Sequence, residues 1–339
     1  MQPDTKRMDM TFSRAILFSL ILAKASALTN SHIAVSSPDY CYDPYRWCGP
    51  KYWQATFQYC TSDFMESQSP VILNPFHMMR NRSMGPLELL AYDVLQSEPW
   101  IIKNIRDTIA VEFNPGMYLG GANLPRSYYT FYMAFHWGSE TTNGSEHIYN
   151  DRRYPMEMQI FHLVPPYQTL NEAAFTERQA VAVLAVFVDI GPEDNPVFET
   201  ISRAVPTIPL AGDEKFIDPF PLRDLLPNDT SKFYQYTGSL TFPECLYAVE
   251  WIVFQEPIYI SQKQYNRFIG TVYYHEPEEG EEPRLLLQNY RPTQALFDRI
   301  LIASANAAVP MFSSSHSLVA SLLAVLLTSL VSLLLPRMT

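Results

Sequence analysis

One histidine lies in a pattern of residues that could support metal or acid–base chemistry. The stretch FYMAFHWGSE spans residues 131–140, and its alternation is typical of a β-strand, on which side chains two positions apart share a face. His136 and Ala134 therefore point in the same direction. Histidine is a common metal ligand and general base, but a metal site needs several donors and alanine has no donor atom. His136 thus sits in a specific setting beside a neighbour that contributes no chemistry.

Other catalytic signatures are absent from the sequence. It contains no Gly-x-Ser-x-Gly elbow, phosphate-binding Gly-rich loop, His-Glu-x-x-His motif or paired catalytic carboxylate signature. Isolated candidates such as Ser239 and Asp189 are more typical of ordinary strand ends.

The elements that must position His136 are mostly strands. Runs rich in β-branched and aromatic residues predict strands at 108–113, 128–137, 156–164, 180–190 and 247–254. Helices are predicted only at 86–95, 171–179 and 297–305. The 27 prolines are spread along the chain, which favours many loops and short elements. The predicted class is mainly β (α+β), with a few short helices.

The N-terminal end has the features of a secretion signal over residues 1–27. Basic residues at positions 6, 7 and 14 precede an apolar run over 15–23, and Ala25-Ser26-Ala27 forms a small-residue cleavage site. The apolar run is too short to cross a bilayer. We therefore predict that the folded domain begins near residue 28 and ends near 305.

The C-terminal end predicts attachment to a membrane. The uncharged run from Ser317 to Leu335 has about the length of a membrane span. Small residues beginning at Asn306, an uncharged spacer and this apolar tail form the signature of a signal for a glycosylphosphatidylinositol (GPI) anchor, with attachment at Asn306. In that case the segment 306–339 is an anchor signal, and everything after Asn306 is removed. The alternative is a retained transmembrane helix, followed by the single basic residue Arg337. Either arrangement holds the domain at the outer face of the plasma membrane.

Four cysteines, Cys41, Cys48, Cys60 and Cys245, allow three pairings. Two disulfides are expected because the secretory pathway is oxidising. The short loop between Cys41 and Cys48 favours their pairing, which leaves Cys60 for Cys245. The long loop that this second bond closes is worth on the order of 5 kcal/mol in the chain-entropy account. No Cys-x-x-Cys pair is present, so the cysteines do not predict a metal site.

The charge of the chain excludes one class of partner. The net charge is −11 and no basic stripe is present to neutralise phosphates, so we expect no nucleic-acid binding. The acidic run over 276–282 is expected to be a solvated loop between strands. Sequons at Asn81, Asn143 and Asn228 fit a glycosylated ectodomain.

Several short motifs together resemble the α-class carbonic anhydrases. They are, in family order, ESQSPV, FHWGSE, NGSEHIYNDRRYPMEMQIFHLV, YTGSLTFPECLYAVEWIVF and QNYRPTQ. The resemblance runs from about Asp39 to Ser304. It implies a central, twisted, mostly antiparallel sheet of about ten strands with an active-site cone. The ends of the chain and the positions of Cys60 and Cys245 look like those of membrane-anchored, extracellular members of that family.

The same resemblance implies where zinc would bind. In the family, a His-x-His on one strand and a Glu-x-His on the next supply three zinc ligands, and these positions correspond here to Ala134, His136 and Gln159. Structural zinc sites with four ligands are worth about 10–16 kcal/mol, so loss of two ligands should cost about 5–8 kcal/mol. Alanine offers no donor, and a glutamine amide is a poor zinc ligand. We therefore expect no bound zinc, no zinc-bound hydroxide and no other cofactor.

No other histidine is expected to complete the site. His162 is three residues from Gln159 and should face the other side of its strand. His147 matches a family residue that lies behind the site. The others are near the chain ends or away from the cone: His32, His77, His275 and His316.

The resemblance also assigns the surroundings of the zinc position. Thr241 corresponds to the gatekeeper hydroxyl that Glu146 orients, and Glu157 to a carboxylate that orients a zinc histidine. The proton-shuttle histidine corresponds to Asp107, which cannot serve in that role at neutral pH. The remaining pocket positions are apolar or aromatic: Tyr132, Phe161, Val183, Leu240, Phe242, Val249 and Trp251.

Added aromatic volume should close the cone. Phe161 and Phe242 stand where the family usually has smaller side chains, and Tyr132 replaces a glutamine that would bind a ligand histidine. Aromatic side chains bury large areas and pack densely, so we expect them to fill the space of metal and substrate.

These features predict a catalytically inactive cell-surface protein that binds an unidentified extracellular protein or ligand. The aromatic stretch over 39–53 is one candidate contact surface, although packing over the edge of the sheet is the favoured interpretation, because most aromatic side chains are buried. The alternative function is residual zinc-dependent carbon dioxide hydration or esterase activity with His136 as ligand. A structural role of the acidic surface is a third hypothesis.

Overall fold

The computed structural model describes residues 40–61, 66–274 and 284–310. The predicted secretion signal, the acidic run over 276–282 and the apolar tail lie outside these ranges, as do His32, His275 and His316. Within the described ranges, no helix is both long and apolar enough to cross a membrane.

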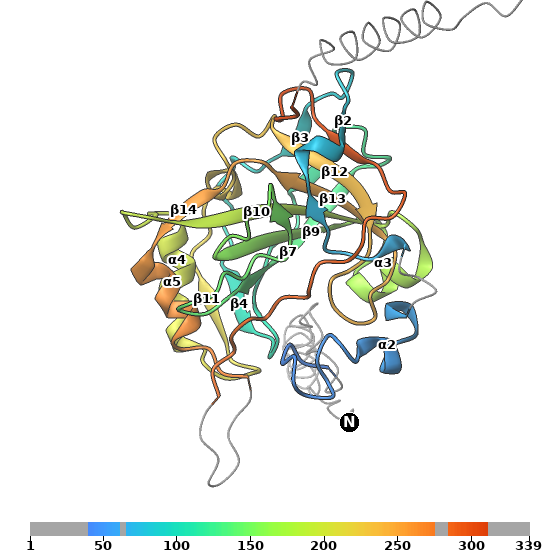
Figure 1. Cartoon of the computed structure of the whole chain (residues 1–339). Coiled ribbons are helices and arrows are strands. Elements are labelled where there is room, and N and C mark those ends of the chain that lie inside the picture. Colours follow the sequence, from blue (N-terminus) through green and yellow to red (C-terminus); the bar gives the residue numbers. More distant parts are fainter. Residues whose placement is uncertain (1–39, 62–65, 275–283, 311–339) are drawn as a thin grey trace, which may run out of the picture.

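One large sheet dominates the described structure (Figure 1). Its thirteen strands follow the main path β11-β4-β5-β7-β9-β10-β13-β12-β15-β2, and β14, β3 and β6 pair beside this path. Most neighbours are antiparallel, whereas β10 pairs in parallel with β13 and β14, and β15 with β2. The predicted mostly antiparallel sheet, with about ten strands in its main path, is confirmed.

The strands are short except at the centre of the sheet, where β7, β9 and β10 are adjacent. Their bounds are β1 (Ile72–Leu73), β2 (Met78–Arg80), β3 (Leu87–Leu90), β4 (Trp100–Asn104), β5 (Ile109–Glu112), β6 (Tyr118–Gly121), β7 (Tyr128–Trp137), β8 (Ile148–Tyr149), β9 (Met156–Leu163), β10 (Val181–Gly191), β11 (Glu214–Ile217), β12 (Phe233–Gly238), β13 (Val249–Phe254), β14 (Ile258–Ser261) and β15 (Leu301–Ala303). Each of the five predicted strands is present. Their β-branched and aromatic side chains suit a sheet that is buried on both faces.

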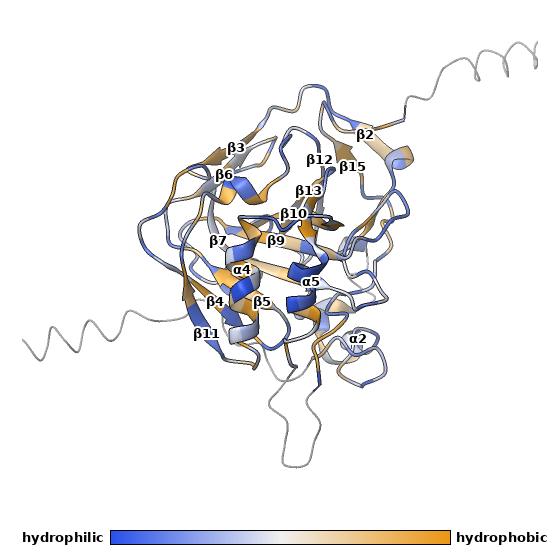
Figure 2. Ribbon diagram, turned by 90° about the vertical axis from the view of Figure 1, so that its left-hand side faces the viewer, coloured by the Kyte–Doolittle hydropathy of each residue, from blue (hydrophilic) through white to orange (hydrophobic). Residues whose placement is uncertain are grey.

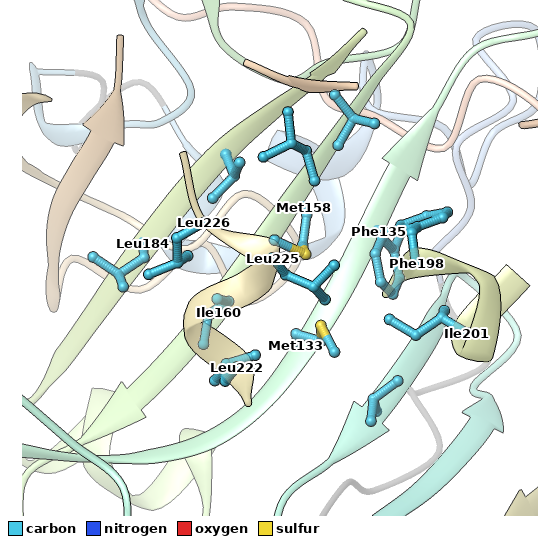
Figure 3. Close-up of a cluster of buried hydrophobic side chains, with 14 of the residues drawn as sticks. Met133, Phe135, Met158, Ile160, Leu184, Phe198, Ile201, Leu222, Leu225 and Leu226 are labelled. Atoms are coloured by element: carbon cyan, nitrogen blue, oxygen red, sulfur yellow. The ribbon is translucent and has the colours of Figure 1, made fainter. Parts of the chain in front are cut away.

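The two faces of the central strands bury different sets of side chains. One face carries Met133 and Phe135 of β7, which pack with Met158 and Ile160 of β9. Figure 3 shows this face together with side chains from the segments that cover it: Phe198, Ile201, Leu222, Leu225 and Leu226. The opposite face carries Ala134 and the surroundings of His136. Alternation along β7 therefore separates a largely apolar core from the candidate site.

Helices cover the sheet at a few places. Their bounds are α2 (Trp53–Thr56), α3 (Leu170–Thr176), α4 (Phe198–Ala204) and α5 (Gln262–Ile269), with 3-10 turns at Gln58–Cys60, Pro75–His77, Val205–Thr207 and Leu222–Leu225. In Figure 2, α4 and α5 lie in front of the hydrophobic strands with hydrophilic residues on their outer sides. Ser261 begins α5 through a capping box with Gln264, which explains why this helix starts there.

Two of the three predicted helices are wrong. The helix predicted at 171–179 is α3, but 86–95 contains β3 followed by turns, and 297–305 contains turns and β15. Residues Leu87–Leu90 pair with β6, and Leu301–Ala303 lie between β2 and β12. Because pairing partners distant in the sequence provide these backbone hydrogen bonds, tertiary context overrides the local helical preference.

One of two disulfides ties the N-terminal segment to the rest of the fold, and the other closes a short loop within the segment. Cys41 bonds to Cys48 and Cys60 bonds to Cys245, as predicted. The second bond spans 185 positions and joins the segment to the loop before β13. Closure of so long a loop restricts the unfolded chain far more than closure of the seven-residue separation between Cys41 and Cys48.

The aromatic stretch over 39–53 serves two purposes. Tyr40, Tyr42 and Trp53 are buried in a small cluster with the Cys60–Cys245 bond, so the expected cover over the sheet exists. Tyr45 and Trp47 are instead 93% and 69% exposed. The short disulfide loop therefore presents two large aromatic side chains to solvent.

The predicted modification sites are accessible to different degrees. Asn143 and Asn228 are exposed, whereas Asn81 is half-buried. Asn306 is exposed, but the next residue, Ala307, is buried in the core, and the backbone of Ala308 bonds with Gln255 and Tyr234. Glycosylation and anchoring at these positions stay predictions.

Candidate functional site

The three predicted ligand positions lie together on β7 and β9. Ala134 stands directly opposite Gln159, and His136 stands opposite Glu157 in the antiparallel register of these strands. All four side chains are buried. The predicted geometry is therefore present, with one imidazole, one methyl group and one primary amide at the three positions.

The amide of Gln159 lies between two buried carboxylates. Its Nε2 donates to Glu146 Oε2 at 2.9 Å and to Glu157 Oε1 at 2.9 Å. Buried carboxylates are costly unless N–H or O–H groups meet their oxygens. Gln159 therefore donates one hydrogen bond to each carboxylate. Among the described side chains, it is the one that bridges Glu146 and Glu157.

His136 has three close neighbours. Its Nδ1 lies 2.7 Å from the main-chain oxygen of Asn289, which requires a proton on that nitrogen for a hydrogen bond. Its Nε2 lies 3.5 Å from Glu146 Oε2. The ring of Tyr42 contacts the imidazole edge-on, with 6.4 Å between the ring centroids. The imidazole is thus enclosed by a carboxylate and an aromatic ring.

His147 lies behind the site, as predicted, and extends the polar network. Its Nδ1 and backbone N–H each lie 2.8 Å from an oxygen of Glu157, and its Nε2 lies 2.8 Å from the Tyr236 hydroxyl. That hydroxyl donates to Ser69 Oγ at 3.0 Å. Every member of this chain is buried, so the network ties β9 and β12 to the segment before β1 without contact with solvent.

These partners control the ionisation of Glu157. Burial alone would raise its pKa, but the His147 imidazole and the hydrogen bonds from Gln159 and the His147 backbone outweigh burial and hold the pKa below 4.5. A carboxyl group with a depressed pKa contributes stability above its unfolded pKa, and this contribution is lost as the pH falls through the folded value. The network therefore stabilises the fold at neutral pH and weakens in acid.

Two oxygen atoms of the site lack partners. Gln159 Oε1 and Thr241 Oγ1 are fully enclosed and accept or donate no hydrogen bond within the described structure. The expected hydrogen bond from Thr241 to Glu146 is therefore not formed. Glu146 instead accepts from Gln159 and from the backbone N–H of Arg291 at 2.9 Å, because the Gln159 amide reaches the carboxylate.

Aromatic residues share a buried cluster with Ala134. Tyr132 and Phe161 are stacked, with 4.6 Å between centroids and 3° between planes, and Phe242 lies 6.4 Å from Phe161 at a tilt. Ala134, Tyr132 and Phe161 are buried, while Phe242 is half-buried. The other predicted pocket residues are also buried in this core: Val183, Leu240, Val249 and Trp251.

The predicted shuttle position is occupied by an ion pair. Asp107 is buried, and both of its oxygens accept from Arg106, from Nε and Nη2, at 3.0 Å each. Such a two-pronged pair fixes the carboxylate in place. Asp107 also contacts groups beyond this arginine.

The other described histidines do not join the site. His162 faces the opposite core, where Tyr92 contacts its Nε2, and burial lowers its pKa to about 3. His77 is exposed in a 3-10 turn. Within residues 40–61, 66–274 and 284–310, no three His, Cys, Asp or Glu side chains are arranged to hold a metal ion.

Sequence reasoning gave no role to three residues that shape the site. Asn289 bonds to His136 through its main chain and to the backbone of β7 through its side chain. Arg291 bonds to Glu146, and Tyr42 covers His136. The motif QNYRPTQ contains the first two, so their neighbourhood was marked in the sequence, but only the fold brings them to β7.

Comparisons with known proteins agree with this geometry. Residues 48–305 match the family model of the eukaryotic-type carbonic anhydrases. Carbonic anhydrase 15 of Mus musculus is 30% identical over 302 residues, which cover 86% of this chain and 90% of the relative. Carbonic anhydrase 4 of Mus musculus is 30% identical over 287 residues, 82% of this chain and 88% of the relative. Receptor-type tyrosine-protein phosphatase zeta of Homo sapiens is 28% identical over 256 residues, 75% of this chain but 11% of that protein.

Replacement of Gln159 tests the bridging amide. The variant Gln159→Leu keeps the volume but leaves Glu146 and Glu157 each without one donor. We expect the free energy of unfolding to fall by about 2–4 kcal/mol at neutral pH. The loss should shrink in acid, as the pH falls through the depressed pKa of Glu157, because the protonated Glu157 carboxyl no longer needs that donor. Urea denaturation at several pH values measures both effects.

The matched control is Gln262→Leu, on the exposed side of α5, where the amide bonds only to Asn266. It should change stability little at any pH. An equal loss for Gln159→Leu at neutral and acidic pH would contradict the role of the carboxylates.

Proposed function

The chain belongs to the eukaryotic-type carbonic anhydrase family, and from this premise we propose that it is a catalytically silent member that acts as a binding module at the cell surface. The observation that carries the proposal is the donor set at the metal position. His136 has an imidazole, but Ala134 has no donor and both N–H groups of Gln159 are directed to carboxylates.

This donor set does not fit a zinc centre with three imidazoles. Zinc prefers nitrogen and sulfur ligands in a tetrahedron. Gln159 offers only its amide oxygen, Thr241 a neutral hydroxyl, and Ala134 nothing. Loss of two of three imidazoles lowers zinc affinity by about four to six powers of ten. Without a metal that lowers the pKa of bound water, hydration of carbon dioxide has no nucleophile at neutral pH.

The packing around the site supports the same proposal. The stacked pair Tyr132–Phe161 lies next to the pair Ala134–Gln159 on the same face of β7 and β9, and Phe242 lies beside Phe161, so bulky aromatic side chains adjoin the metal position. The polar network around Gln159 stabilises the sheet without a metal. Packing and hydrogen bonding thus give these residues a structural role that needs no metal.

A binding role is supported by the exposed part of the N-terminal segment. Tyr45 and Trp47 stand on the loop closed by Cys41 and Cys48, with Arg46 between them. Tyr, Trp and Arg are the residues most enriched at energetically important interface positions, and a disulfide-closed loop loses little entropy on binding. Phosphatase zeta, in which the similar region is 11% of the protein, is named a receptor.

Location at the cell surface follows from the sequence features of both ends. The secretion signal over 1–27 and the C-terminal signature, with GPI attachment at Asn306, support an extracellular, membrane-held domain. The alternative is a single-pass membrane protein. Two disulfides and three sequons fit that compartment.

The second candidate function is residual zinc-dependent hydration or esterase activity. Family membership favours it, because similar proteins are named carbonic anhydrases. It requires His136 to hold zinc with weak oxygen donors, which the affinity argument above disfavours.

Restoration of the missing ligands tests the proposed loss of zinc. We expect the triple variant Ala134→His, Gln159→His and Phe242→Thr to bind about one zinc per chain, since it regains three imidazoles and the space around them. The native chain and the single variant Ala134→His should bind none. Metal analysis after dialysis, together with the visible spectrum of the cobalt form, measures this.

Addition of His136→Ala to the triple variant is the control and should abolish metal uptake. If the folded triple variant takes up no zinc, the assignment of the three positions is incorrect.

Replacement of the exposed aromatic residues tests the binding surface. In a screen of the ectodomain against displayed extracellular proteins, partners should lose about tenfold or more in affinity with Tyr45→Ser plus Trp47→Ser. The control Tyr259→Ser changes an aromatic residue on β14 that is 56% exposed, and it should have no effect. Equal binding by both variants would exclude the loop as the contact surface.

A further inference from the structure

A cavity of about 400 Å³ lies beside the exposed disulfide loop. Its walls come from the N-terminal segment around α2, at the lower right of Figure 1, and from residues 288–294. They include Tyr42, Lys51, Tyr290 and Arg291, together with three prolines. This volume is within the range of ordinary small-ligand pockets. The cavity is lined by none of Ala134, His136 and Gln159, although Tyr42 and Arg291 contribute both to it and to the buried site.

Arg291 is a buried cation without an acidic partner in this wall. It is 4% exposed, and within the described residues no carboxylate lies within 4.0 Å of its guanidinium. Its Nη1 donates to the Ser69 carbonyl at 2.9 Å, and its guanidinium lies over the ring of Trp53. Glu146 accepts from the backbone of Arg291 and not from its side chain. Buried arginines are normally paired, so this one is exceptional.

The remaining N–H groups of Arg291 open toward the cavity. Among the described residues, three side chains have a fully enclosed polar atom without a hydrogen-bond partner: Gln68, Gln159 and Thr241. No nitrogen of Arg291 belongs to this set. The unpaired nitrogens of Arg291 are therefore not sealed in the core, and the cavity is the space that this residue lines. Burial lowers the pKa of Arg291 to about 10, so the group stays positively charged at neutral pH.

The charge of the cavity is opposite to that of the chain. Lys51 stands exposed at its rim, and no Asp or Glu contributes to its wall. The whole chain has a net charge of −11. A positive cavity in an acidic protein favours an anionic ligand of small charge, because a polyanion would be repelled by the surrounding surface.

The walls further define the anion. One buried guanidinium presents parallel N–H donors that match a carboxylate. The tyrosine and proline side chains around it form an apolar lining that suits a compact hydrocarbon or aromatic body. We propose that this cavity binds an organic carboxylate with an apolar body, with Arg291 contacting the carboxylate and Lys51 assisting at the rim. The inference does not depend on the absence of catalysis, because none of the zinc positions lines the cavity.

The test compares two ligands that differ only in charge. The purified ectodomain is titrated with N-acetyl-L-phenylalanine and with N-acetyl-L-phenylalanine amide, and binding is followed by calorimetry and by the fluorescence of Trp53, which lies under the guanidinium. We expect the acid to bind at least about tenfold more tightly than the amide, since a charge-assisted pair is lost in the amide. Equal binding of acid and amide, or no binding of either at about 10 mM, would overturn the proposal.

Variants locate the binding to this cavity. Two variants should each weaken binding of the acid by about threefold or more. Lys51→Gln removes the charge of an exposed residue, and Arg291→Lys keeps the charge but loses the paired N–H donors of the guanidinium. The control Lys263→Gln removes an exposed positive charge on α5 and should leave it unchanged. Unchanged affinity in both cavity variants, with the folded state verified by circular dichroism, would refute the assignment.

The source of the carboxylate is distinguished by a second pair of probes. A tetrapeptide that ends in phenylalanine is tested with a free and with an amidated C-terminus. Tighter binding of the free peptide than of the single amino acid would identify a polypeptide C-terminus as the ligand. Binding of the single acid alone would identify a small molecule. Both results support a carboxylate site.

Discussion

Two carboxylates that lie in the core beside β9 must be met by N–H donors, and much of the site depends on this constraint. Gln159 meets it with one amide group that donates to Glu146 and Glu157. A buried carboxylate that lacks a donor would take up a proton or destabilise the fold. The amide therefore gives both carboxylates a donor, whereas the family resemblance pairs Glu157 with a zinc histidine and Glu146 with the Thr241 hydroxyl.

The remaining packing is consistent with that substitution. Strand positions that hold no metal can have large aromatic neighbours, and the stack of Tyr132 and Phe161 adjoins Ala134 and Gln159 on the same face of the sheet. The polar residues around the buried site stabilise the fold, because they bond to one another and connect several strands. The surfaces available to ligands are then outside the buried site, at the disulfide loop and at the cavity next to it.

The sequence predicts the elements best where one local pattern is sufficient. The run over 128–137 forms β7 over its whole length, because alternation and β-branched content agree there. Residues 86–95 looked helical from composition, yet pairing with β6 makes part of them a strand. The capping box of Ser261 and Gln264 was a readable signal for α5 that the prediction did not use.

At the site, the resemblance located Ala134, His136 and Gln159, but not the bridging role of the amide. The roles of Asn289 and Arg291 could not be derived either, since they depend on contacts between residues about 150 positions apart.

The most direct test of the central claim is the zinc content of the native ectodomain, purified in the presence of zinc and then dialysed. The arrangement of Gln159 predicts far less than one zinc per chain and no X-ray absorption signature of imidazole-bound zinc. One tightly held zinc per chain, with His136 among its ligands, would contradict the account and identify the protein as a zinc enzyme.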